Sequence, residues 1–445
     1  MREKYSWIQY KLHIIVLIIV VISTLIGVKE IKLTNNMVIL IIPFIYSLIL
    51  GLLVYLAKPI KFIGKEQVKF SENFMVLLLG VLIAKLAVSC GQSIFTVFNF
   101  GPALILQQIG DLGTLIVIPL ALILGFKRES IGMGTSICRE PSLSIIGDIF
   151  GVKSDEFNGV LIILIIGSIL GAIFINILTS VCISFLPIHP YAYAMASGVG
   201  SVSMSTASLT SLTGMFPSMA TDLEALTACS NILSTVFGIY LTIFVSIPLA
   251  EVVYKYLNPI LGKKEKSADY SHALEDNDNR SDVENNKFDF SLVDVNFTNI
   301  KKSFILLMIF SLITSFGTWL GLNDSFINIF VGMIIISVIT IVGMIISAII
   351  PYKVPSIVYI SLIGILLVIP GVPTADLISY YVSSVDLTVI CIVFMAYVGV
   401  AIGEDWQIFK KIGLKGIVIT FFVIAGTFLG SAFIAQLVLT LTNFV

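Results

Sequence analysis

Apolar residues lie in long uninterrupted runs along this chain, and most charged residues lie in the short stretches between them. The runs are about 18–25 residues long, and about 20 helical residues cross the hydrocarbon core of a bilayer. They lack the alternation of apolar and polar residues that marks the strands of a membrane barrel. The pattern predicts eleven membrane-spanning helices, at about 12–28, 37–57, 74–97, 103–125, 159–187, 223–250, 303–321, 325–350, 355–371, 386–402 and 416–442.

The composition supports the same fold class, an all-α polytopic membrane protein. Hydrophobic residues make up 57% of the 445 residues and charged residues only 12%, whereas soluble domains carry about 25% charged residues. The net charge of −1 and the lack of a basic block give no indication of nucleic acid as a partner. The lipid bilayer is therefore the first partner that the sequence predicts.

Basic residues cluster beside five of the predicted spans, and such residues favour the cytoplasmic ends of short loops. The clusters precede the first and last spans and follow the second, fourth and sixth. All five lie on one side if the N-terminus is cytoplasmic and the C-terminus outside, with Lys29 and Lys32 as exceptions. We therefore expect a multi-pass protein of the cell membrane in this orientation.

One long polar stretch, residues 258–300, divides the chain. Its centre, residues 273–286, is acidic and almost free of aromatic residues, which is typical of disordered linkers. It predicts an N-terminal membrane unit of residues 1–257 and a C-terminal unit of about five helices in residues 301–445. We expect the C-terminal unit to serve as a scaffold or as the surface of a homodimer.

Two stretches, residues 131–151 and 197–217, are too rich in Gly, Ser and Thr for lipid-facing helices. Each precedes an acidic patch and then an apolar span. We interpret the pair as an internal repeat of broken or re-entrant segments, named the first and second segments. At an offset of 66 residues, the matching positions include Gly132 with Gly198, Gly134 with Gly200, Thr135 with Ser201, Ser142 with Ser208, and Leu143 with Leu209.

The relative orientation of the two segments depends on whether they cross the membrane. If each dips in and returns to its own side, the single span between them makes the repeats inverted. If each crosses fully as a broken helix, the repeats are parallel. The charge pattern hardly separates the two cases, and the inverted arrangement is favoured.

Paired broken segments are typical of transporter binding sites, because unwound backbone at membrane depth can bind ions and substrate. Glycine lets the backbone approach a ligand, and hydroxyls both donate and accept hydrogen bonds. The alternative is that these small residues only pack helices together. The candidate substrate-binding residues are Gly132, Gly134, Thr135, Ser136, Arg139, Pro141, Ser142, Gly198, Gly200, Ser201 and Ser203.

The first segment contains the most specific feature, Arg139-Glu140-Pro141. A charge pair inside a membrane segment is costly and indicates function, and the proline favours a helix break there. Arg139 could hold a substrate carboxylate, while Glu140 could carry a proton or bind a cation. A structural ion pair is the alternative. The candidate ion-coupling residues are Glu140, Ser205, Thr206 and Asn231.

Other polar residues of the apolar runs carry less weight. Lys85 lies in the middle of a predicted span and could pair with Glu140 or Asp148, or extend toward the headgroups. Asn231 could equally serve a hydrogen bond between helices. The least weight falls on three polar residues beside a span end, Gln107, Gln108 and Asp111.

Motifs of common enzyme and pump classes are missing from the sequence. It has no G-x-x-x-x-G-K-[ST], which argues against a pump driven by ATP, and no H-E-x-x-H. We therefore expect no enzyme activity, no metal and no cofactor. Gly110-Asp111 and Gly147-Asp148 invite comparison with intramembrane aspartyl proteases, but the wider motif is absent.

A family resemblance covers most of the chain. GPALILQQIGDLGT at 101–114, TSICREPS at 135–142 and HPYAYAMASGVGSVSMSTA at 189–207 resemble the DUF3100 domain family of uncharacterised bacterial multi-pass membrane proteins. Over about residues 70–250, the same order is more weakly similar to LrgB/CidB-type membrane proteins and the plastid glycolate/glycerate transporter. Near the position of a histidine in those proteins, this chain has Ser203 and Met204, so no role built on that histidine carries over.

The weaker resemblance implies membership of the broad group of bile-acid symporters and cation–proton antiporters, whose folds use inverted repeats with two broken helices. The main hypothesis is then a secondary transporter, coupled to H⁺ or Na⁺, for a small anionic metabolite that binds between the two segments. One alternative is a non-transporting, holin-like regulator or assembly partner in the membrane. Another is an intramembrane hydrolase, which would need two facing carboxylates or a serine with a base.

Overall fold

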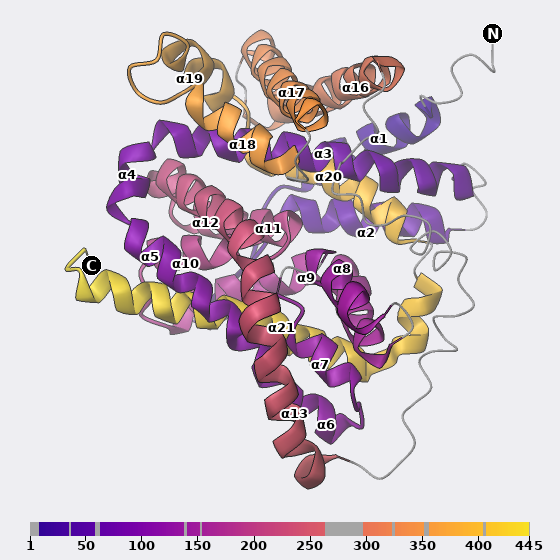
Figure 1. The fold of residues 1–445 in the computed structure, drawn as a ribbon. Helices are drawn as coiled ribbons and strands as arrows, with labels where there is room; N and C mark the ends of the chain where they lie inside the picture. Colours follow the sequence, from indigo (N-terminus) through magenta and orange to yellow (C-terminus); the bar gives the residue numbers. More distant parts are fainter. Residues whose placement is uncertain are drawn as a thin grey trace. The chain divides into compact units, whose positions relative to one another are not determined.

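A computed structural model describes residues 9–34, 37–57, 63–137, 140–151, 154–262, 297–322, 325–350, 356–403 and 406–444. Over these residues the protein is helical, with one two-stranded hairpin (Figure 1). Residues 263–296, most of the predicted linker, lie outside the described residues. Both ends of the predicted linker are helical, because α13 (Ile247–Leu261) runs into it and α16 (Phe297–Leu322) begins within it.

Seven helices of the described chain are long and apolar enough to cross a membrane, or eight if the bent pair α19 (Ala375–Ser383) and α20 (Leu387–Ile402) counts as one span. Three shorter apolar helices, α1 (Tyr10–Ile26), α2 (Pro43–Leu56) and α18 (Ser356–Leu366), lie on three further predicted spans. Many large apolar side chains are exposed, as expected of a surface that faces lipid. The prediction of a polytopic helical membrane protein is confirmed, whereas the number of eleven spans stays a prediction.

The chain forms two compact units, and they are not the sequential halves that the linker predicts. Unit 1 comprises Met1–Val97, Met219–Ala228 and Phe290–Glu404. Unit 2 comprises Phe98–Ser218, Cys229–Asp289 and Asp405–Val445. The last helix, α21 (Trp406–Leu441), belongs to unit 2, so the predicted C-terminal unit of residues 301–445 does not hold together as one body.

In unit 1, α20 is the central helix and is buried along almost its whole length. It packs against α1, α2, α16 and α3 (Lys65–Gln92). α2 and α20 approach closely at Gly51 and Gly399, where a Cβ on either glycine would overlap the backbone of the other helix. His13 Nδ1 on α1 and the hydroxyl of Tyr397 on α20 form a buried hydrogen bond of 2.5 Å.

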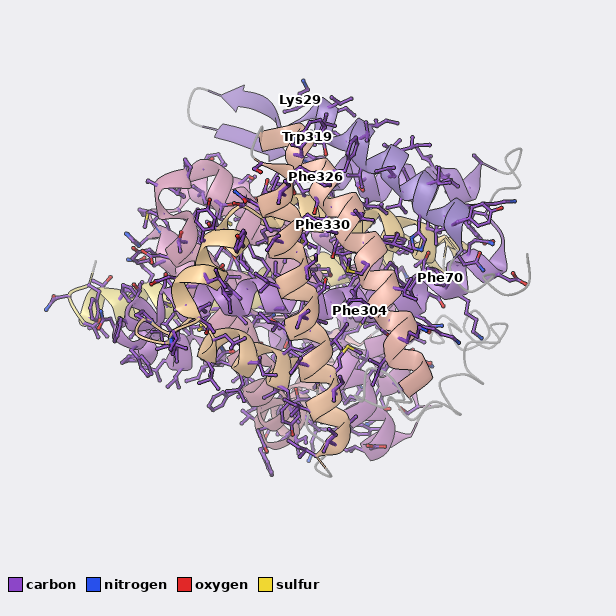
Figure 2. All side chains as sticks on the ribbon, turned by 90° about the horizontal axis from the view of Figure 1, so that it is seen from above. Lys29, Phe70, Phe304, Trp319, Phe326 and Phe330 are labelled. Atoms are coloured by element: carbon purple, nitrogen blue, oxygen red, sulfur yellow. The ribbon has the colours of Figure 1, made fainter. Side chains whose placement is uncertain are left out.

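Helices α16 and α17 (Phe326–Ile349) of unit 1 run side by side (Figure 2). Phe304 and Trp319 on α16 are exposed. The hydroxyls of Ser311 and Ser337, which are buried between the two helices, lie 3.0 Å apart. Apolar residues on the outside and small polar residues at the helix contact are typical of membrane helices.

A hairpin of β1 (Lys29–Thr34) and β2 (Met37–Ile41) connects α1 to α2. The predicted span 37–57 therefore begins as a strand, which its β-branched residues favour. The helix itself begins only at Pro43. Proline suits this position, because it lacks an amide hydrogen, and amide hydrogens in the first turn of a helix have no partner within the helix.

Unit 2 is built around the long helix α9 (Asp155–Phe185) and α21, which is kinked at Gly413. α21 packs against α9, α5 (Gly101–Leu106), α10 (Pro190–Ser197) and the 3₁₀ helix η2 (Gln107–Ile116). η2 leads into α6 (Val117–Leu124), so the predicted span 103–125 is helical but 3₁₀ in its middle. α12 (Ala220–Leu241) continues through a π turn, η4 (Thr242–Ser246), into α13, which extends the predicted span 223–250 to Leu261.

Glycines bring η2 and α21 into backbone contact at two levels. A Cβ on Gly110 would overlap the backbone of Gly430 and Ser431, and a Cβ on Gly113 would overlap the carbonyl of Gly426. Three residues of a 3₁₀ helix rise about 6 Å, as do four residues of an α-helix. The three residues from Gly110 to Gly113 on η2 therefore cover the same length as the four residues from Gly426 to Gly430 on α21. Both contacts can form at the same time.

Candidate functional site

The first segment consists of a helix, a break and a second helix. α7 (Glu129–Gly134) ends where the hydroxyls of Thr135 and Ser136 donate to carbonyls of its last turn, at 3.0 and 2.8 Å. α8 (Glu140–Phe150) follows the break, with Pro141 in its first turn. Arg139 and the side chains of Glu140 and Pro141 lie outside the described residues, so their predicted roles stay predictions.

The two glycines of α7 lie at helix contacts. A Cβ on Gly132 would overlap the carbonyl of Glu156 on α9, and a Cβ on Gly159 of α9 would overlap the carbonyl of Glu129. A Cβ on Gly134 would lie 2.7 Å from the side chain of Ile118 on α6. In this structure, these candidate substrate-binding glycines therefore allow helices to pack closely.

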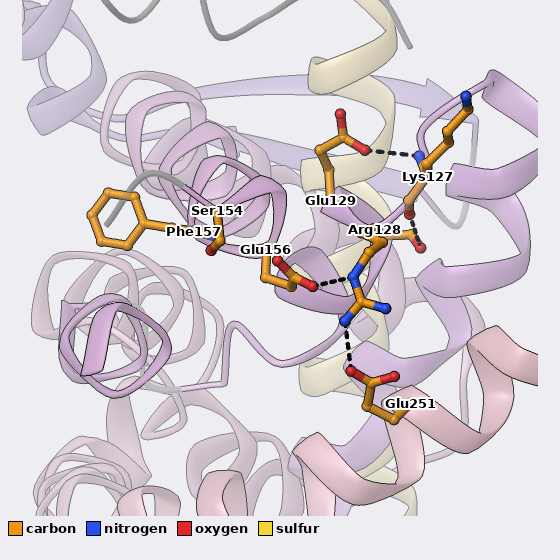
Figure 3. A network of polar contacts seen from close by, with 8 residues as sticks. Lys127, Arg128, Glu129, Ser154, Glu156, Phe157 and Glu251 are labelled. Carbon is orange, nitrogen blue, oxygen red and sulfur yellow. Dashed lines mark hydrogen bonds and ion pairs between the residues drawn. The ribbon is translucent and has the colours of Figure 1, made fainter. Parts of the chain in front are cut away.

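An ion-pair network holds the start of the first segment (Figure 3). The guanidinium of Arg128, just before α7, donates to Glu156 in the first turn of α9 and to Glu251 on α13, the latter at 2.8 Å. Glu129 accepts a hydrogen bond from the amide of Lys127 at 2.8 Å, while burial raises the pKa of the Glu129 carboxyl. The network thus fixes α7 to α9 and α13.

The second segment is also a helix, a break and a helix, α10 and α11 (Val202–Met215). The chain leaves α10 at Gly198 and turns at Gly200, whose φ of 93° is a left-handed conformation that favours glycine. Asn231 on α12 holds the break. Its amide donates to the carbonyls of Gly198 (2.9 Å) and Gly200 (3.3 Å) and to the hydroxyl of Ser205 (3.2 Å).

The hydroxyls around the second break bond mainly to nearby groups of the same segment. Ser205 donates to the carbonyl of Ser201 at 3.1 Å, and Thr206 donates to the carbonyl of Ser203 at 3.0 Å. The hydroxyls of Ser201 and Ser203 lie 3.2 Å apart. The structure thus brings together Asn231 and the predicted serines of the second segment, in an arrangement that stabilises the break.

Both segments pack against α9, because α7, α8 and α11 all contact that helix. Met204 on α11 reaches α9 at Gly171, where a Cβ would overlap its methyl group. The hydroxyl of Ser208 lies 2.7 Å from those of Thr179 on α9 and Ser197 on α10. A cavity of about 10 Å³ beside this contact has room for no more than about one water molecule.

The sequence interpretation gave little weight to three polar residues of η2, which the structure buries. Gln107 and Asp111 have no exposed surface, and Gln108 is 4% exposed. They face α12 and α21, where Gln107 Nε2 donates to the Ser230 hydroxyl at 2.8 Å. The signal was present, since an acidic residue within a run of span length indicates function by default, but the residues were assigned to a span end.

In unit 1, Lys85 pairs with Glu224 on α12. Lys85 Nζ lies 3.6 Å from Glu224 Oε2, and the Ser89 hydroxyl donates to the same oxygen at 2.7 Å. The two charged side chains are only 7% and 17% exposed. The sequence suggested Glu140 or Asp148 as the partner of Lys85. Asp148 is exposed on α8, and the side chain of Glu140 lies outside the described residues. Glu224 is a partner that the sequence interpretation missed.

The fold and the candidate site define a helical, polytopic membrane protein with two broken segments packed on one long helix. The chain belongs to the family described as protein of unknown function DUF3100, whose family pattern matches residues 21–256. This match includes η2, both segments and α12, and it confirms the family expected from the sequence. No curated protein and no solved structure matches the chain.

Replacing Asn231 with leucine is expected to destabilise the second break. The change leaves the carbonyls of Gly198 and Gly200 without their donor, and an unsatisfied buried group costs about 1–3 kcal/mol. The melting temperature of the purified protein in detergent measures the effect. The control is Thr235→Val, one turn further along α12, which removes only a hydroxyl that donates to a carbonyl of the same helix. Equal melting temperatures for the two variants would contradict the role of Asn231.

Proposed function

We propose that this chain is a secondary transporter, coupled to H⁺ or Na⁺, of a small anionic metabolite. The supporting observation is that each broken segment of unit 2 leads from its break into the N-terminus of a helix, α8 or α11. Helix N-termini carry unpaired amides and partial positive charge, which attract anions. Broken helices of this kind are typical of the binding sites of secondary transporters.

Finer claims about the repeat belong to the same proposal. We propose that the two segments are inverted repeats, as in bile-acid symporters and cation–proton antiporters, and that LrgB/CidB-type proteins and the plastid glycolate/glycerate transporter are distant relatives. The shared order of elements supports a repeat, although it does not distinguish inverted from parallel repeats. α7 and α8 precede the long helix α9, and α10 and α11 precede the long helix α12.

Finer claims about topology belong to it as well. We propose eleven spans in the cell membrane, with the N-terminus in the cytoplasm and the C-terminus outside. The basic residues beside five spans support this orientation. A homodimer is a further expectation of the proposal, and unit 1, with its exposed apolar helices α16 and α17, offers a surface for it.

The proposal is tested by flux in liposomes that contain the purified protein, with radiolabelled monocarboxylates, dicarboxylates and amino acids. We expect saturable uptake of one such class, driven by a gradient of H⁺ or Na⁺. Arg139→Ala is expected to reduce this uptake about 10-fold or more, because a charge-assisted hydrogen bond contributes about 1.5–3 kcal/mol. Lys29→Ala, at an exposed position of β1, is the control and should transport normally. Uptake unchanged by Arg139→Ala would remove this residue from the site.

A non-transporting role as a regulator or assembly partner is the second candidate. It is favoured by the hydrogen bonds of Thr135, Ser136 and Ser205 to their own segments, which leave these hydroxyls serving the backbone. Absence of saturable flux for every class of substrate would support it. The aspartyl version of the hydrolase alternative is disfavoured, because Asp111 is fully buried whereas Asp148 is exposed, and two such carboxylates do not form a catalytic pair.

A further inference from the structure

η2 carries a row of polar side chains into the interior of unit 2. A 3₁₀ helix has three residues per turn, so residues three apart lie on one face. Gln108, Asp111 and Thr114 form such a row, and Gln107 lies beside it. All four residues are buried. A carboxylate and two amides are therefore enclosed together, away from water.

The amide hydrogens of the two glutamines are all engaged. Gln107 Nε2 donates to the Ser230 hydroxyl at 2.8 Å and to the Leu104 carbonyl at 3.4 Å. Gln108 Nε2 donates to the carbonyls of Leu104 at 3.3 Å and Ser230 at 3.4 Å. Exchanging nitrogen and oxygen in either amide would set a carbonyl oxygen against the Leu104 carbonyl, which cannot donate. In each glutamine, the nitrogen is therefore the atom that faces the Leu104 carbonyl, and the oxygen is the acceptor that remains.

Three buried oxygen atoms remain without a donor among the described residues: Gln107 Oε1, Gln108 Oε1 and Asp111 Oδ2. The other carboxylate oxygen, Asp111 Oδ1, accepts a hydrogen bond from the Ser431 hydroxyl at 3.4 Å, and the Ser234 hydroxyl on α12 also hydrogen-bonds to this carboxylate. Buried acceptors without a donor are costly, and a buried carboxylate whose partners are only neutral hydroxyls is costlier still. Each of the three oxygen atoms therefore needs a partner that carries a positive charge or donates a hydrogen bond.

We propose that Gln107, Gln108 and Asp111 form the binding site of one monovalent cation, H⁺ or Na⁺. A proton on Asp111 gives the carboxyl a hydrogen to donate, while Na⁺ would use the oxygens as ligands. Either occupant neutralises the buried charge. The inference rests on the proposed transport function and deepens it, because it names the site of the coupling ion. It places that ion on η2 instead of on the hydroxyls of the second segment.

η2 is hydrogen-bonded toward both broken segments, so an ion bound there can act on both. Thr114 donates to the carbonyl of Gly134, the last residue of α7, at 2.6 Å. Ser230, which accepts from η2, donates in turn to the carbonyl of Met195 on α10 at 2.6 Å. The next residue, Asn231, holds the second break. Binding and release of the cation therefore change the charge of an element that is hydrogen-bonded to the end of α7 directly and to α10 through Ser230.

The test is the melting temperature of the purified full-length chain in detergent. It is measured against Na⁺, with choline keeping the ionic strength constant, and separately against pH. A ligand that binds the native state raises the melting temperature. We expect a rise of several degrees with Na⁺ if Na⁺ is the ligand, or a rise on acidification at any Na⁺ concentration if the ligand is H⁺. Asp111→Asn should abolish the rise, and Asp376→Asn, at an exposed site on α19, should keep it.

A second variant keeps the test decisive if Asp111→Asn fails to fold. Gln108→Met has a similar length but lacks the oxygen, so it should weaken the same response, and a full response in Gln108→Met would then overturn the site. The site is equally overturned if wild type responds to neither ion more than Asp111→Asn does. A wild-type response without any substrate flux would refute the transport function while the cation site stands. With flux present, Asp111→Asn should keep substrate exchange and lose gradient-driven uptake.

Discussion

Gly113→Ala is expected to lower the free energy of unfolding by about 3 kcal/mol, near the upper end of the usual cost of overpacking. The new Cβ would overlap the carbonyl oxygen of Gly426 in the middle of α21, and a backbone atom cannot turn away as a side chain can. The contact between Gly110 and Gly430 holds the same two helices together one turn earlier, so they cannot separate locally. Thermal or denaturant unfolding in detergent measures the loss.

Gly101→Ala is the matched control for this change. Gly101 lies on α5 in the same unit, and a Cβ there would meet nothing within 4 Å. Alanine is favoured over glycine in a helix, so this variant should be as stable as wild type or slightly more stable. If both alanine variants unfold alike, η2 and α21 do not approach through their glycines.

Lys85→Met should be the second strongly destabilising change, at about 3–5 kcal/mol. It leaves the mostly buried carboxylate of Glu224 with the Ser89 hydroxyl but without its cation. The double variant Lys85→Met/Glu224→Gln removes both charges and should recover most of the loss, because an uncompensated charge rather than a missing contact is the cause.

The double-mutant cycle also has an outcome that contradicts this account. In that outcome, the loss of free energy of unfolding in the double variant equals the sum of the losses in Lys85→Met and Glu224→Gln. The two residues then do not interact, and Lys85 contributes only through its apolar stem. Repeating the cycle at high salt adds a check, since a buried pair is screened much less than an exposed one.

The fold class could be predicted from the sequence because it depends on local hydropathy alone. Runs such as 159–187 must be helices if they lie in lipid, whatever they contact. The division into units could not be predicted, because α21 joins η2 across more than 300 residues of chain. Gly110, Gly113, Gly426 and Gly430 encode that contact, but their matching becomes visible only once η2 is known to be a 3₁₀ helix.

The candidate site was predicted in part for the same reason. The breaks after α7 and α10 follow from local clusters of small residues, and both segments contain a break. Asn231 was chosen for its polarity within a span, and it lies at the second break. Asp111 was undervalued, because its significance comes from unpaired buried oxygens, and burial depends on which helices surround it. Glu224 was missed as the partner of Lys85, because ion pairs between distant segments leave no mark on a single sequence.

The matched rise of η2 and α21 has a mechanical consequence for unit 2. Sliding α21 by one residue would bring Ala425 or Thr427 opposite Gly113, where even a single Cβ has no room. The two helices therefore have a single permitted register and form a rigid frame. If the chain is the transporter proposed above, any exchange between inward-open and outward-open forms would have to leave this frame intact, and the two breaks, each held by a few exchangeable hydrogen bonds, are the expected positions of the hinges.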